Sequence, residues 1–169
     1  MGKRILKGVI IIFNEGDKIS YPMNGAGVIE KIERKKILGE VHEYYILNIP
    51  IGNLKLMIPT DNAQEIGVRK VVTEEEADEV MEYFKNISNY EECEWNKRYR
   101  ENAEKLKKGI LVDVAYIAKT LYLRDRNRPL STTERKMFLS AKNILLSELA
   151  LVKENSCEEL EKILFEDAV

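Results

Sequence analysis

The chain has 169 residues, 44% of them hydrophobic and 33% charged, with a net charge of −2. The apolar fraction excludes a disordered chain and the charged fraction excludes a membrane protein, so we expect one ordinary or two small domains. Two isolated cysteines and a single histidine provide neither a zinc site nor a catalytic triad, and they are typical of a reducing compartment. We therefore expect a cytoplasmic protein that is not an enzyme, with no metal and no cofactor.

The first part of the chain is β-rich. An apolar run from Gly8 to Phe13 is too short for a signal peptide. Residues 1–10 are therefore expected to be an extra strand, or a leader that is not part of the native protein. Residues 13–72 contain about five short runs of β-branched and aromatic residues, which turn residues separate. This pattern predicts a small, strongly bent sheet or SH3-like barrel, with an exposed edge near residues 53–58.

From Thr73 onward the hydrophobic period becomes helical. Thr73 is a candidate N-cap, and the three glutamates that follow it suit the first turn of a helix. Residues 86–94 are polar and predict a linker. Apolar residues at helical spacing then predict four more helices, at about 95–107, 110–124, 132–152 and 156–166.

These elements predict an α+β fold with two domains. A small barrel is expected over residues 1–72, a helix and linker over 73–94, and an all-α helical domain over 95–169. The third of the four later helices has a sharply defined start, because Ser131 and Glu134 have the spacing of a capping box.

Charge is distributed unevenly along the chain. Residues 1–94 carry 12 basic and 17 acidic side chains, whereas residues 95–142 carry 13 basic and 5 acidic ones, a local net charge of +8. Such a basic helical segment suits a polyanion such as DNA or RNA. The alternative is a solvated helical surface that is merely rich in Lys and Arg.

The only tryptophan, Trp95, begins the first basic helix, close to Lys97, Arg98 and Arg100. One interpretation is a nucleic-acid contact, in which the indole presses against bases and the cations hold phosphates. The other is a structural tryptophan that fastens the helix to the core beside Tyr99, one turn later. The pattern alone favours this second interpretation.

Two sets of spaced residues carry a family resemblance. They are Phe13-x-x-Gly16-Asp17-x-x-x-Tyr21-Pro22-x-x-Gly25-x-Gly27-x-Ile29, and Trp95-x-x-Arg98-Tyr99-x-x-Asn102-x-x-Lys105-Leu106 with Glu134-x-x-Met137. Together with further matches from about residue 13 to about residue 152, they resemble the CarD/CdnL family of bacterial transcription regulators. Transcription-repair coupling factors carry a module similar to the first set, but the helical half and the absence of helicase motifs favour CarD/CdnL.

The resemblance implies a fold and a mechanism. The N-terminal module would be a Tudor-like barrel that binds the β-subunit lobe of RNA polymerase, and the helical domain would lie on promoter DNA at the upstream edge of the −10 element. In this family a tryptophan wedges into the minor groove and stabilises the open complex. Trp95 holds that position, which makes the nucleic-acid interpretation the favoured one.

The resemblance also implies contact residues. Phosphate contacts, largely without sequence specificity, would come from Lys97, Arg98, Arg100 and Arg135. Lys35 and Met57 fall where the family contacts the polymerase, although some relatives carry Arg at the position of Met57. The expected protein is a monomer that joins the nucleoid through RNA polymerase and has no membrane contact. The alternative is a stand-alone nucleic-acid-binding protein that uses the SH3-like barrel itself, which the acidic balance of that segment argues against.

Overall fold

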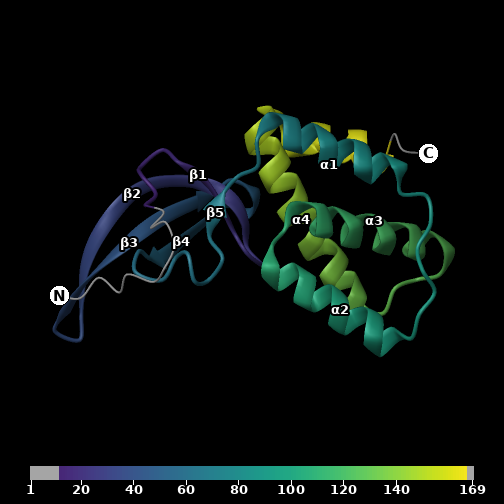
Figure 1. Cartoon of the computed structure of the whole chain (residues 1–169), viewed down its shortest axis with the longest axis horizontal. Helices are drawn as coiled ribbons and strands as arrows, with labels where there is room; N and C mark the ends of the chain where they lie inside the picture. Colours follow the sequence, from purple (N-terminus) through teal and green to yellow (C-terminus); the bar gives the residue numbers. More distant parts are fainter. Residues whose placement is uncertain (1–11, 167–169) are drawn as a thin grey trace.

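The N-terminal half is a curved antiparallel sheet, within the residues 12–166 that this computed structural model describes (Figure 1). Its strands are β1 Lys18–Tyr21, β2 Gly25–Ile37, β3 Glu40–Ile49, β4 Leu54–Pro59 and β5 Arg69–Lys70. The order across the sheet is β4-β3-β2-β1-β5, so the predicted edge strand near residues 53–58 does lie at an edge. The expected small, bent sheet is confirmed.

The sheet has a core of its own. Alternate residues of β3, namely Tyr45, Leu47 and Ile49, point into it, as the two-residue period of a strand requires. Phe13 is fully buried there, with its ring edge-on to Tyr45 at 5.8 Å between centroids, although residues 12–14 form no strand. The leader or extra strand expected over residues 1–10 lies outside the described residues.

The C-terminal half is helical, and its bounds fall close to the predicted ones. A short 3-10 turn, Ile51–Asn53, precedes β4, and a π-helical turn, Lys162–Glu166, ends the described chain. The helices between are α1 Glu74–Asn86, α2 Trp95–Lys108, α3 Leu111–Asn127, α4 Thr132–Lys153 and α5 Cys157–Glu161. No helix within residues 12–166 combines the length and hydropathy needed to cross a membrane.

The helix starts show which caps the sequence could predict. At α1 the Thr73 hydroxyl accepts from the Glu76 N–H at 3.2 Å, and the Glu76 carboxylate accepts from the Thr73 N–H at 2.8 Å, a complete capping box. At α4 the Ser131 hydroxyl accepts from the Glu134 N–H, but the return bond is missing. The capping box predicted there is only half formed, because the Glu134 carboxylate binds Arg98 instead.

Helix α1 belongs to the helical core. Its buried residues Ala77, Val80 and Phe84 pack in one cluster with the buried faces of α3 and α4. Residues 87–94 have no regular secondary structure, as expected of a linker, but they connect two helices of the same core. The change from sheet to helices falls earlier, at residues 71–73.

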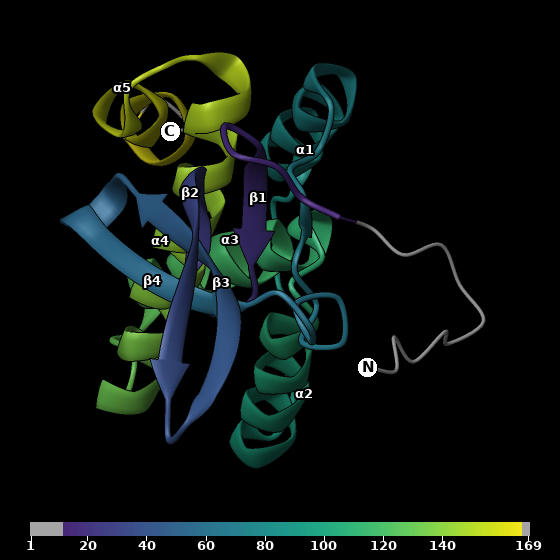
Figure 2. The same cartoon turned by 90° about the vertical axis from the view of Figure 1, so that its left-hand side faces the viewer.

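The two halves meet at an interdomain joint made by Ala26, Arg69, Ser147 and Glu148, where α4 packs against β2 (Figure 2). The Arg69 guanidinium donates to both carboxylate oxygens of Glu148, at 2.7 and 3.0 Å. Glu148 is 1% exposed and also accepts from the Val72 N–H. The Ser147 hydroxyl accepts from the Ala26 N–H at 2.9 Å. A bidentate, partly buried ion pair of this kind fixes geometry as well as charge.

Candidate nucleic-acid and polymerase interfaces

Trp95 stands at the first position of α2 and lies outside the core. Its side chain is 40% exposed and stacks in parallel on the Tyr99 ring, with 5.3 Å between centroids and 7° between planes. Tyr99, one turn later, packs in turn against the helical core. The Trp95 ring thus rests on a residue that packs against the core, as the structural interpretation expects, but it stays 40% exposed, where a partner can reach it.

The outer face of α2 carries more cations than carboxylates, with Glu101 and Glu104 on the same face as its lysines. Lys97 is well exposed, and its ammonium lies 3.9 Å from Glu101, the limit of an ion pair on one helix face. Arg100 is exposed and makes no ion pair with any residue of the 12–166 segment. Lys107 and Lys108 extend the same face, because spacings of three, four and seven residues recur on one side of a helix. That spacing could have identified both lysines from the sequence.

Arg98 is placed differently from its neighbours. Its side chain is only 15% exposed, and Nε donates to a Glu134 carboxylate oxygen at 2.7 Å. Nη1 donates to the Cys93 carbonyl at 2.9 Å. The hydrogen bond with Glu134 raises the pKa of Arg98, against the opposing effect of burial. The guanidinium is therefore committed to joining α2 to α4, and a phosphate would have to compete with a buried carboxylate. This placement argues against the expected phosphate contact.

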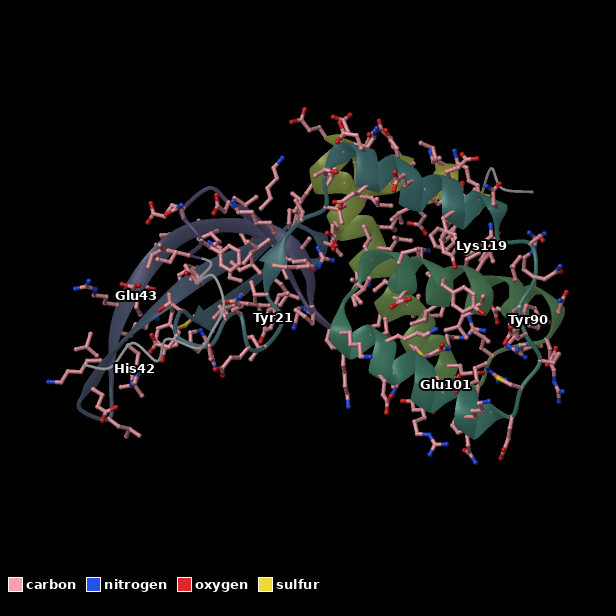
Figure 3. All side chains as sticks on the ribbon, viewed as in Figure 1. Tyr21, His42, Glu43, Tyr90, Glu101 and Lys119 are labelled. Atoms are coloured by element: carbon pink, nitrogen blue, oxygen red, sulfur yellow. The ribbon has the colours of Figure 1, made fainter. Side chains whose placement is uncertain are left out.

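The loop that leads into Trp95 is held by the end of α3. Arg124 lies over the Tyr90 ring at 4.3 Å and donates to the Glu91 carbonyl, while the Asn127 amide donates to the Tyr90 hydroxyl at 3.0 Å. Figure 3 shows Tyr90 at this end of the helical half, near the α2 residue Glu101. These contacts enclose a polar cavity of about 110 Å³, lined also by Arg98. They fix the approach of the chain to the first turn of α2.

Arg135 lies on the first turn of α4, next to Glu134. Its guanidinium is about half exposed and donates to the Asp125 carboxylate at 2.9 Å. The same Asp125 oxygen accepts from the Leu130 N–H. An exposed pair of this kind contributes little to stability, so Arg135 can exchange Asp125 for an external anion. The contact between Arg98 and Glu134 brings this turn of α4 to the beginning of α2.

Lys35 and Met57 share one face of the sheet. Met57 lies opposite Ile46, which lies opposite Lys31, and Lys35 follows Lys31 by four residues along β2. The pleat therefore places all four on the face opposite the sheet core. Both Lys35 and Met57 are exposed. Met57 also belongs to the edge strand β4, whose outer N–H and C=O groups have no neighbouring strand among the described residues.

The described residues contain no candidate metal site. No group of three or more His, Cys, Asp and Glu side chains in the 12–166 segment could hold a metal ion. His42 lies on β3, 3.5 Å from the Glu40 carboxylate at the surface of the sheet (Figure 3).

Comparisons with known proteins cover both halves of the chain. Residues 13–72 match a family model described as the CarD-like/TRCF RID domain, and residues 63–165 match one described as the C-terminal domain of CarD. The "Putative transcription factor YdeB" of Bacillus subtilis (strain 168) is 34% identical over 142 residues. The aligned region covers 84% of this chain and 93% of that relative.

Proposed function

This chain belongs to the CarD/CdnL family of bacterial transcription regulators, and we propose that it acts at promoters held by RNA polymerase. The sheet binds the β-subunit lobe of the polymerase, and the helices contact promoter DNA at the upstream edge of the −10 element. The outcome is a more stable open complex. The observation that carries the proposal is the half-exposed Trp95, held flat on Tyr99 at the beginning of a cationic helix.

The proposed DNA contact combines a wedge with phosphate contacts. An aromatic or aliphatic side chain inserted at a base step costs a few kcal/mol of unstacking, which contacts to the bent DNA must offset. Lys97 and Arg100 lie on the same helix as Trp95 and would supply such contacts, with Arg135 from α4. Arg98 would instead hold α2 in place through Glu134. Phosphate contacts carry no sequence information, so the polymerase would set the position on the promoter.

The proposed polymerase contact uses the face of Lys35 and Met57 and the free edge of β4. An exposed edge can pair with a strand of the partner, whose main-chain groups then satisfy those of β4. Docking on the polymerase raises the effective concentration of the helical half at the DNA. Weak DNA binding by the chain alone is therefore sufficient.

Variants of the two surfaces test the two contacts separately, because each surface should affect a different measured quantity. We expect Trp95→Ala to shorten the lifetime of the open complex on a defined promoter while lobe affinity stays unchanged. We expect Met57→Glu and Lys35→Glu to reduce the affinity of the full chain for the isolated lobe. Folding is followed by the unfolding temperature, which Trp95→Ala should change little, because the stack on Tyr99 contributes only about 0.5–1.5 kcal/mol.

A matched control is Tyr83→Ala, which removes another aromatic side chain of nearly equal exposure, on α1. It should leave both the lifetime and the lobe affinity at wild-type values. An unaltered lifetime for Trp95→Ala, or a large drop in its unfolding temperature, would contradict the wedge. Wild-type lobe affinity in both sheet variants would place the polymerase contact elsewhere.

A further inference from the structure

The hairpin that joins β2 to β3 ends in an unusual turn. Ile37 pairs with Glu40, so Leu38 and Gly39 alone make the turn. Both have positive φ, at +50° for Leu38 and +85° for Gly39. The Leu38 side chain is 100% exposed, and its neighbours Ile37 and Val41 are also exposed.

Leu38 breaks two local rules of folding. Two-residue turns with positive φ at both positions favour Asn-Gly or Asp-Gly, because a leucine side chain is strained in the left-handed region. A fully exposed leucine also gains nothing from burial in return. Backbone strain that no contact within the chain offsets points to a function at that position. The hairpin tip thus presents an apolar side chain that no part of the described chain buries.

The charges beside the tip favour a protein partner over nucleic acid. Two of the three cations before the tip lie beside carboxylates: Arg34 lies 3.4 Å from Glu43, and Lys35 lies 3.8 Å from Glu33. Lys36 makes no ion pair with any described residue. A single unpaired cation attracts a phosphate backbone only weakly, because each phosphate contact needs a cation of its own. The tip also continues the face proposed for the polymerase, since Lys35 lies three residues before Leu38 on β2.

We propose that Leu38 is an anchor that enters an apolar pocket on the β-subunit lobe of RNA polymerase. This inference rests on the proposed function, because the occupant is the lobe that Lys35 and Met57 are proposed to contact. The hairpin then acts as a second point of attachment beyond the edge of β4. Binding buries the leucine and so recovers the free energy that its exposed position does not provide in the free chain.

The test is Leu38→Asn in the full chain. Asparagine tolerates the left-handed region, so the unfolding temperature should stay the same or rise. Loss of a buried leucine should weaken binding to the isolated lobe by roughly ten- to a hundredfold. A Leu38 that contacts no partner would give the first result without the second, and a Leu38 that supports the fold would give a lower unfolding temperature. The matched control is Leu139→Asn, which replaces an exposed leucine on α4 and should leave lobe affinity unchanged.

The other outcomes identify other occupants and overturn the inference. If Leu38→Asn binds the lobe with wild-type affinity, the inference is wrong. A wild-type dimer that Leu38→Asn dissociates, with lobe affinity unchanged, would assign the tip to a second copy of the chain. A loss of promoter-DNA affinity alone would assign it to nucleic acid. If the wild-type chain fails to bind the lobe at all, the proposed function itself fails, and that result is distinct from a failure of Leu38 alone.

Discussion

Lys119 is a charged residue inside the helical half, on the side of α3 that faces α1 (Figure 3). Its side chain is 3% exposed, and its ammonium lies 4.7 Å from the centre of the Phe84 ring. It forms no ion pair with any residue of the described chain. Burial lowers the pKa of Lys119, and the nearby Arg126 lowers it further. The contact with Phe84 offsets part of the cost of removing this charge from water.

We expect Lys119→Met to stabilise the fold near neutral pH, since methionine keeps the apolar stem and removes the buried charge. A gain of about 1 kcal/mol would raise the unfolding temperature by about 2–4 °C for a chain of this length. The folded state has the lower lysine pKa, so the cost is full below that pKa and disappears as pH rises toward the ordinary lysine value. The difference between variant and wild type should therefore narrow in alkaline solution.

Thermal unfolding at about pH 7 and about pH 9.5 measures this effect. Lys85→Met, at an exposed position near the end of α1, is the control and should change little at either pH. A lower unfolding temperature for Lys119→Met would show instead that the contact with Phe84 outweighs desolvation.

Single residues are also where prediction from sequence met its limit. The spacing of Ser131 and Glu134 correctly predicted a helix start, because an N-cap depends only on neighbours in the chain. It could not predict that Glu134 would turn to Arg98, 36 residues earlier. For the same reason the sequence grouped Arg98 with Lys97 and Arg100, although only the latter two are exposed. Composition identifies a cation but not its partner across the fold.

At the scale of elements, local rules were sufficient. Helix α1 begins after Thr73 with the expected cap, and α2 ends at Gly109, whose φ of +71° suits a glycine. The strands of the sheet were predicted from alternation and turn residues, and β4 lies at the predicted edge. These features depend on residues a few positions apart, and therefore a single sequence determines them well.

The outer face of α2 leads to a prediction about salt. Each phosphate contact contributes about 0.9 to the slope of log affinity against log salt concentration. We expect Arg100→Gln to reduce this slope by about 1, measured by anisotropy on a promoter fragment. Arg98→Gln should leave the slope unchanged and instead lower the unfolding temperature. It strands the buried Glu134 carboxylate, which costs about 3–5 kcal/mol.

The two variants form a matched pair on one helix, two residues apart. If both reduce the slope equally, Arg98 binds phosphate in the complex and its contact with Glu134 is exchanged on binding. Lys153→Met, which removes ion pairs to Glu74 and Asp78 on α1, provides a control for loss of a cation elsewhere.

At the scale of the whole molecule, the interdomain joint sets the geometry between the two proposed interfaces. The sequence placed a linker at residues 86–94 from composition alone. Packing instead includes α1 in the helical core and joins sheet to helices through Arg69 and Glu148, which lie 79 residues apart. A pairing over that distance leaves no local pattern, so this contact could not be predicted from the sequence.

We expect the joint to matter most when both interfaces are occupied. Arg69→Lys keeps the charge but cannot reproduce the bidentate bond to Glu148. Lobe affinity and DNA affinity, each measured alone, should remain within about twofold, because a small free-energy change moves each only slightly. The lifetime of the open complex should shorten markedly, because it requires both contacts at a fixed separation. An unchanged lifetime would show that the two halves act as independent tethers.

The burial of Glu148 has a consequence for how the chain melts. Its carboxylate lies within the helical half, but the cation that neutralises it comes from β5 of the sheet. Loss of the sheet removes this cation and also uncovers the carboxylate, because β2 packs against α4 at this point, so the ion pair and its hydrogen bonds are lost together with the sheet. Pro22 adds to this dependence, since it lies between Gly67 near the sheet and Gly109 between α2 and α3. We therefore expect the two halves to unfold in a single transition, and the helical half to be less stable when it is cut from its sheet.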